Sequence, residues 1–125
     1  MRTLILGATG FLGSPIRRAV EEHPGVDDVV VVGLTPPADG RPWQELDLAA
    51  ADDAVLADLL AEHRPDAVVN AAGRTTGTPD QLHGLNVAMV DRLLGAVRRV
   101  VPGARVVHVG SAAEYGPPHD REPTR

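Results

Sequence analysis

The sequence predicts an α/β protein built on a doubly wound parallel sheet, and two observations lead to this prediction. Short apolar runs typical of buried strands alternate along the chain with longer segments whose apolar residues recur at helical spacing. A glycine-rich segment also follows the first apolar run directly and precedes the first helical segment. Parallel strands need crossover connections, which are usually helices, so this alternation favours a sheet covered on both faces. We expect about five strands in the order 3-2-1-4-5.

Apolar and β-branched residues mark the expected strands. The first run ends in Gly7, and the second consists of four consecutive valines followed by Gly33. Strands that are buried on both faces have continuous apolar runs of this kind, and β-branched residues favour extended backbone. The strands are expected at residues 3–6, 29–32, 43–46, 67–69 and 105–109.

Three segments have the periodicity of amphipathic helices, at residues 11–20, 52–62 and 82–101. The first ends before Pro24 and the second before Pro65, as expected for residues that cannot continue a helix. The alternation of strands and helices stops after Gly110. We therefore expect one domain over residues 1–111 and a loop or tail over residues 112–125, with no second domain.

Composition excludes several classes of function. The chain has 125 residues with 12 basic and 17 acidic side chains, and its formal net charge of −5 argues against binding to nucleic acid or to an anionic membrane. It contains no Cys and no Lys, which excludes thiolate chemistry and lysine-dependent mechanisms within these residues. Its five His are scattered without metal-ligand spacing, so no metal site is expected. Since no signal-peptide core and no membrane-spanning run are present, we expect a cytoplasmic protein.

Gly7, Gly10 and Gly13 lie between the first expected strand and the first expected helix. A turn this tight needs glycine for unusual backbone angles and for close approach of the backbone to a diphosphate. Free N–H groups at the start of the helix, near Phe11 and Leu12, would face the anion with the positive end of the helix dipole. We therefore expect a dinucleotide to bind at this glycine loop.

Five segments of the chain together resemble one known family. The glycine loop reads GATGFLG, and the other segments are Asp47-Leu48, Asn70-Ala71-Ala72-Gly73, Asn86-Val87 and the Ser-x-x-x-Tyr-Gly segment that starts at Ser111. In this order and spacing they resemble the extended short-chain dehydrogenase/reductases, the NAD-dependent epimerase/dehydratase group. The resemblance covers essentially the whole chain and implies a Rossmann-like fold.

The resemblance also implies a cofactor, NAD or NADP, and the residues that bind it. In the family, the glycine loop holds the diphosphate, an Asp-hydrophobic pair lies beside the adenine ring, and a small-residue stretch lines the central portion of the cofactor. By position these residues are Gly7, Thr9, Gly10, Phe11, Leu12 and Gly13 in the loop, Asp47 and Leu48 beside the adenine, Ala71, Ala72 and Gly73 along the central portion, and Asn86 on the long helix.

The second strand leaves the choice between NAD and NADP open. NAD-preferring members place an acidic residue at its end, about 20 residues past the glycine motif, to accept the ribose hydroxyls. The matching residue here is Thr35, which can hydrogen-bond a 2′-hydroxyl but repels no phosphate. The nearby cation that could meet an NADP phosphate is Arg41. Thr35 is therefore a candidate cofactor-binding residue for either dinucleotide.

Ser111 is the catalytic residue that the resemblance supplies. In the family this Ser hydrogen-bonds the substrate oxygen that gains or loses a proton, and the carboxyl end of a parallel strand is where ligands bind. The family's catalytic Tyr belongs to a separate Tyr-x-x-x-Lys element further along. This chain has no Lys, and Tyr115 is followed four residues later by His119. We therefore expect the cofactor-binding N-terminal half of such an enzyme, truncated before the catalytic helix and the substrate lobe.

Two functions from different classes stay open at this point. One is the NAD(P)-binding portion of an epimerase, dehydratase or reductase that acts on a hydroxyl-bearing small molecule such as a nucleotide sugar. The other is a non-catalytic dinucleotide-binding module that senses redox state or regulates a partner. Ser111 favours the first, and the missing Tyr-x-x-x-Lys dyad favours the second.

We also expect a homodimer. Val106 and Val107 would lie on an edge strand, whose free backbone groups are a template for pairing with another chain. The long helix carries Leu85, Met89, Leu93 and Val97 on one stripe, more apolar surface than one sheet face is expected to hide. A two-fold contact through the edge strand or through this helix would bury these surfaces.

Overall fold

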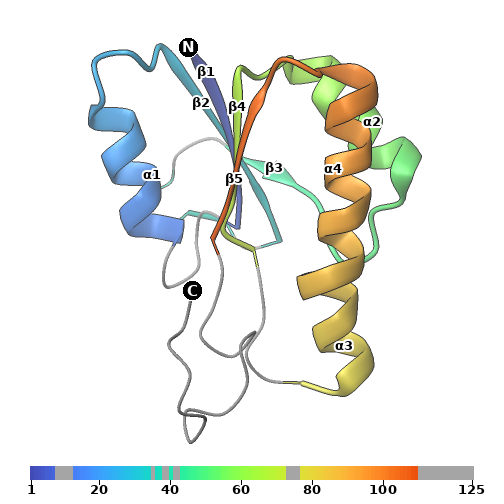
Figure 1. Ribbon diagram of the computed structural model, residues 1–125. Helices are drawn as coiled ribbons and strands as arrows, with labels where there is room; N and C mark the ends of the chain where they lie inside the picture. The colour runs from blue at the N-terminus through green and yellow to red at the C-terminus, as the bar shows by residue number, and fades with distance from the viewer. Residues whose placement is uncertain (8–12, 35, 38–39, 41–42, 73–76, 110–125) are drawn as a thin grey trace, which may run out of the picture.

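A five-stranded parallel sheet forms the centre of the protein (Figure 1). The computed structural model describes residues 1–7, 13–34, 36–37, 40, 43–72 and 77–109. Every strand pair in the described part is parallel, and the order β3-β2-β1-β4-β5 confirms the predicted topology. The strands are β1 (Arg2–Leu6), β2 (Asp28–Gly33), β3 (Gln44–Glu45), β4 (Ala67–Asn70) and β5 (Arg105–His108).

Helices cover both faces of the sheet (Figure 1). On one face lies α1 (Gly13–Glu22), and on the other lie α2 (Asp53–His63) and a long helical run. This run comprises α3 (Pro79–His83), a π-helical turn η1 (Gly84–Ala88) and α4 (Met89–Val100). It begins at Pro79, earlier than expected, because Thr78 and Gln81 form a capping box: the Thr78 hydroxyl accepts the Gln81 N–H at 3.2 Å, and Gln81 Oε1 accepts the Thr78 N–H at 3.0 Å.

Alternate residues of β1 face two separate clusters of buried side chains. Leu4 and Leu6 point toward α2 and α4, whereas Ile5 points toward α1. The side chains of Leu4, Ile5 and Leu6 are all fully buried. The larger cluster joins these two β1 leucines to the buried leucines of α2 and to Met89 and Leu93 of α4. The continuous apolar run at the start of the chain therefore forms a central strand that is buried on both faces.

The structure corrects the expectation that the long helix exposes a large apolar stripe. Met89, Leu93 and Val97 are only 0%, 1% and 5% exposed. They belong to the same buried cluster as the leucines of α2, so α2 helps to cover them along with the sheet. The prediction that these three side chains form a dimer contact is therefore wrong, because they are already buried within the chain.

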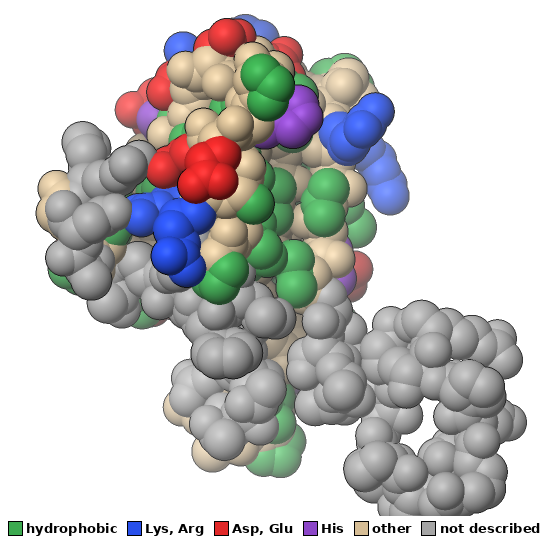
Figure 2. All heavy atoms as spheres, turned by 90° about the vertical axis from the view of Figure 1, so that its left-hand side faces the viewer, with side chains coloured by type: hydrophobic (Ala, Val, Ile, Leu, Met, Phe, Trp, Pro, Cys, Tyr) green, Lys and Arg blue, Asp and Glu red, His purple; other side chains and the backbone are tan. Residues whose placement is uncertain are grey.

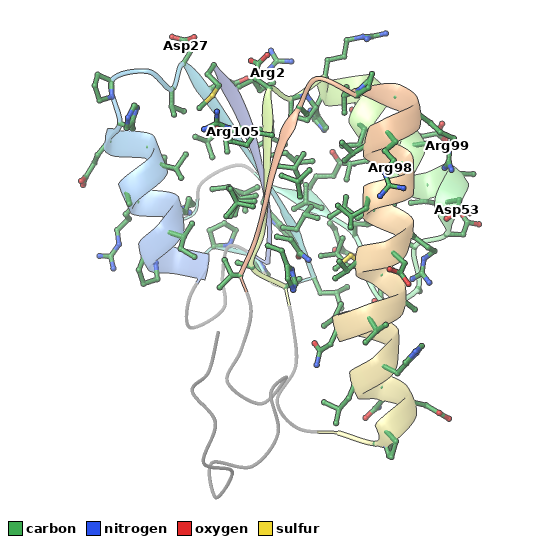
Figure 3. The ribbon with its side chains drawn as sticks, viewed as in Figure 1. Arg2, Asp27, Asp53, Arg98, Arg99 and Arg105 are labelled. Carbon is green, nitrogen blue, oxygen red and sulfur yellow. The ribbon has the colours of Figure 1, made fainter. Side chains whose placement is uncertain are left out.

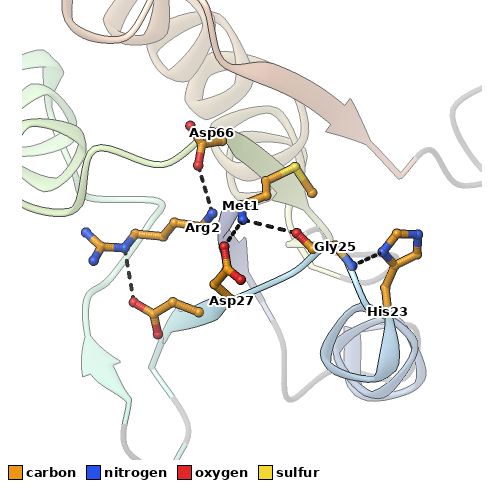
Figure 4. Close-up of polar contacts among 7 residues, drawn as sticks. Met1, Arg2, His23, Gly25, Asp27 and Asp66 are labelled. Carbon is orange, nitrogen blue, oxygen red and sulfur yellow. Dashed lines mark hydrogen bonds and ion pairs between the residues drawn. The ribbon is translucent and has the colours of Figure 1, made fainter.

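Charged groups close the amino edge of the sheet (Figures 3 and 4). The Met1 amine donates to the Gly25 carbonyl at 3.0 Å and pairs with the Asp27 carboxylate. The hydrogen bond that the Met1 amine donates to the Asp27 carboxylate, together with the positive charge of the amine, holds the pKa of Asp27 below its usual value. Arg2 donates its backbone N–H to Asp66 at 2.8 Å and pairs its side chain with Asp28 at 3.0 Å. Gly7, Asp47, Ala71 and Ala72, which were expected to bind a cofactor, lie at or just beyond the opposite, carboxyl edge.

Candidate functional site

Gly7 packs the turn after β1 directly against the end of β4. Its φ of +75° is a left-handed conformation that favours glycine. A Cβ added there would lie 2.7 Å from both Cα and N of Ala72, so no side chain fits without moving that backbone. The Gly7 N–H donates to the Val32 carbonyl at 3.0 Å, and the Ala71 N–H donates to the Leu6 carbonyl at 2.9 Å. The ends of β1, β2 and β4 therefore meet at this glycine.

The meeting point is also where the strand order reverses. From β1 the chain goes out to β2 and β3 on one side and then returns to β4 and β5 on the other. In open parallel sheets the crevice outside the carboxyl ends at such a switch point is where ligands bind. The structure thus brings together Gly7, Ala71 and Ala72, which the sequence assigned to one cofactor site.

Asn70, the last residue of β4, organises this edge and was not among the predicted site residues. It is fully buried. Its Oδ1 accepts the Ala72 N–H at 3.2 Å, its Nδ2 lies 3.2 Å from Nδ1 of His108, and its backbone carbonyl accepts the Val109 N–H at 2.9 Å. A polar residue that ends an otherwise apolar strand was the signal for it in the sequence. Asn70 fixes the turn that follows β4 and ties it to the end of β5.

His108 receives a defined orientation from this contact. Since Asn70 Oδ1 is engaged as an acceptor, the amide nitrogen faces His108 and donates to Nδ1. The exposed His108 ring therefore lies against the Asn70 amide at the end of β5, three residues before Ser111 in the sequence.

Asp47 and Leu48 lie just beyond β3, on the same edge of the sheet. The Leu46 N–H donates to the Gly33 carbonyl at 3.0 Å, which holds this segment beside the end of β2. Asp47 is exposed, and its Oδ1 accepts the Ala49 N–H at 3.1 Å. Leu48 is only 6% exposed and packs in the core cluster. Asp47 therefore exposes its side chain to solvent, whereas Leu48 packs in the core and anchors the segment.

Asn86 occupies the π-helical turn η1 and is half-buried. The wider turn is closed by the Met89 N–H, which bonds to the Gly84 carbonyl. Single π-helical turns within α-helices are frequent at functional sites. The periodicity of the sequence predicted a continuous helix here and gave no sign of the turn.

The other predicted site residues lie outside the described residues: Thr9, Gly10, Phe11, Leu12, Thr35, Gly73 and Ser111. Gly13 is the first described residue of α1. Within the described ranges, no helix is long and apolar enough to cross a membrane, and no three His, Asp or Glu side chains are grouped to hold a metal ion.

A parallel sheet with a glycine turn packed at its switch point is typical of dinucleotide-binding α/β proteins. The chain matches the model of the NAD dependent epimerase/dehydratase family over residues 3–125. It is 38% identical over 117 residues to dTDP-6-deoxy-L-talose 4-dehydrogenase (NAD(P)(+)) of Kitasatospora kifunensis, an alignment that covers 92% of this chain and 36% of that relative. The chain belongs to the NAD-dependent epimerase/dehydratase family, as its motifs predicted.

Solved structures agree with the Rossmann-like fold. A hypothetical dTDP-4-dehydrorhamnose reductase from Sulfolobus tokodaii is 29% identical, with a TM-score of 0.70 over 86% of this chain and 38% of its own. The UDP-glucose 4-epimerase of Thermus thermophilus, in complex with NAD, is 25% identical, with a TM-score of 0.65 over 80% of this chain and 34% of its own. The chain thus spans well under half the length of each of these relatives.

Proposed function

We propose that this chain is the NAD(P)-binding N-terminal portion of an extended short-chain dehydrogenase/reductase. The observation that carries the proposal is the close approach of Gly7 to Ala72, with the added Cβ only 2.7 Å from backbone. This contact joins Gly7, at the end of β1, to Ala72, just after β4, at one switch point. A diphosphate there would meet backbone N–H groups and the N-terminus of α1.

The rest of the cofactor would extend along the carboxyl edge in both directions. The adenosine half would lie toward β2 and β3, near Thr35 and the exposed Asp47. The nicotinamide half would lie toward β4 and β5, near Ala72 and Ser111. The NAD(P) named for the Kitasatospora relative and the NAD bound to the Thermus epimerase support this cofactor.

For the parent enzyme we propose epimerase, dehydratase or reductase chemistry on a hydroxyl-bearing substrate such as a nucleotide sugar. The names of the similar proteins, which refer to dTDP- and UDP-linked sugars, support this substrate class. In this chain Ser111, three residues after His108 in the sequence, would hydrogen-bond the reacting substrate oxygen. When bound, the nicotinamide would supply the hydride acceptor or donor.

Calorimetric titration with NAD and NADP tests the cofactor proposal. We expect the wild type to bind at least one of them and Gly10→Val to bind neither, because the branched side chain would block the diphosphate from the loop backbone. Gly103→Val is the matched control, since a Cβ at Gly103 meets nothing within 4 Å. Equal affinity of the wild type and Gly10→Val would show that the loop does not hold the cofactor.

We also propose that copies of the chain associate through β5. In the described part of the chain β5 is an end strand of the sheet. Val107 is 45% exposed beside Val69, on the α1 side, where Figure 2 shows uncovered hydrophobic side chains. Sedimentation equilibrium at micromolar concentration should show a dimer that Val107→Lys dissociates, since an edge lysine opposes strand pairing. A wild-type monomer of 13.1 kDa would contradict this proposal.

A further inference from the structure

Arg92 ties helix α4 to the segment between β3 and α2. It is half-buried, next to the buried Leu93. Its Nε donates to the carbonyl of Ala51 at 2.8 Å, and its Nη2 donates to the carbonyl of Ala49 at 3.3 Å. One guanidinium thus binds two carbonyls of a single short turn, more than 40 residues away in the chain.

The turn that Arg92 holds begins at Asp47. The Asp47 carbonyl accepts the N–H groups of Ala50 and Ala51 at 3.1 and 3.0 Å, and its Oδ1 accepts the Ala49 N–H at 3.1 Å. Ala49 therefore donates to Asp47 through its N–H while its carbonyl accepts from Arg92. The carboxylate at the candidate site and the guanidinium on α4 are linked through this one residue.

We propose that Arg92 is a positioning residue for the adenine half of the cofactor site, a role that rests on the proposed function. Buried Met89 and Leu93 fix α4 in the core, so a guanidinium on this helix is a rigid support for the turn. Without it, the carbonyls of Ala49 and Ala51 lose their charged donor, and the orientation of Asp47 is held by the turn alone. A binding site gains affinity when such supports hold its residues in place before the ligand arrives.

The test compares ligands that contain adenine with one that does not. Calorimetric titration with NAD, AMP and nicotinamide mononucleotide would be carried out on the wild type, Arg92→Met and Arg92→Lys. Methionine keeps an unbranched apolar stem but removes all the donors. We expect Arg92→Met to bind NAD and AMP about tenfold more weakly, with unchanged affinity for nicotinamide mononucleotide. Arg92→Lys, which keeps a charged donor, should recover part of the loss.

Arg98→Met is the matched control, because it removes the same charge from an exposed position near the end of α4 (Figure 3). Its affinities should equal those of the wild type. If the wild type binds AMP and Arg92→Met binds it equally well, the role of Arg92 is refuted while the proposed function stands. A wild type that binds neither NAD nor NADP refutes the proposed function itself.

Equal weakening of AMP and nicotinamide mononucleotide in Arg92→Met would also refute the role, since it indicates general loss of structure. Thermal unfolding of each variant identifies that case directly. If Arg92→Met does not fold, the same titrations with AMP and nicotinamide mononucleotide are carried out on Arg92→Gln. Preferential loss of AMP binding by Arg92→Gln supports the positioning role, and equal loss of both ligands overturns it.

Discussion

Replacing Gly7 by alanine should destabilise the fold through two separate effects. The new Cβ would lie 2.7 Å from Cα and N of Ala72, whereas ordinary contacts are 3.4 Å or longer. These are backbone atoms next to the Ala71–Leu6 hydrogen bond, so no rotamer change relieves the contact. Overpacking of this kind costs about 1–3 kcal/mol. The φ of +75° adds about 1–2 kcal/mol for an L-residue. We therefore expect the free energy of unfolding to fall by about 2–5 kcal/mol.

Gly40→Ala separates the two effects. Gly40 has the same φ of +75°, but a Cβ there meets nothing within 4 Å, so only the backbone effect of about 1–2 kcal/mol applies. Urea unfolding, followed by the fluorescence of the single tryptophan, Trp43, measures both variants against the wild type. An equal loss of stability in Gly7→Ala and Gly40→Ala would refute the reasoning, because the contact with Ala72 would then contribute nothing.

Three further substitutions test other features of the fold. Thr3→Val should raise the free energy of unfolding by about 1 kcal/mol in urea, because the buried Thr3 hydroxyl has no hydrogen-bond partner among the described residues; a lower urea midpoint would contradict this. Gly84→Ala should raise the free energy of unfolding by about 0.5–1 kcal/mol, because Gly84 has helical backbone angles and open space around it. A lower free energy of unfolding would show that η1 requires glycine. The lowered pKa of Asp27 means that its stabilising contact is present above its unfolded pKa of about 3.8 and is lost as the pH falls through the lower folded value. The thermal midpoint of Asp27→Asn should therefore depend less on pH below about pH 4 than that of the wild type, and parallel curves would contradict the ion pair with the Met1 amine.

Periodicity predicted the fold well where burial is continuous. In β1 and β2 the first residue is exposed, and every following residue is buried or half-buried. The apolar composition of these two runs was therefore enough to predict them as strands. The third strand was harder to predict, because it is an end strand with little burial. Residues 43–46 were expected, but among the described residues only Gln44 and Glu45 pair as a strand, with the end of β2. Polar end strands carry little of the apolar pattern on which such predictions depend.

The long helix shows a second limit. Its apolar stripe was correctly predicted, but its start was expected at residue 82. The helix begins at Pro79 because of the Thr78–Gln81 capping box, a local signal that is present in the sequence. The π-helical turn at Asn86 has no such local mark. The amount of apolar surface that the helix leaves exposed was overestimated, because the covering leucines of α2 lie about 30 residues away in the chain.

The sequence by itself determined which residues are apolar, where the chain turns on glycine and proline, and which motifs stand in family order. These properties depend on neighbours in the chain, since periodicity and turn chemistry are local. The tertiary structure decided which polar groups find partners. Asn70 meets His108, and Arg92 meets Ala49 and Ala51, across separations of about 40 residues. Such pairs form only after parallel strands and packed helices bring distant segments to within hydrogen-bonding distance, so no local pattern encodes them.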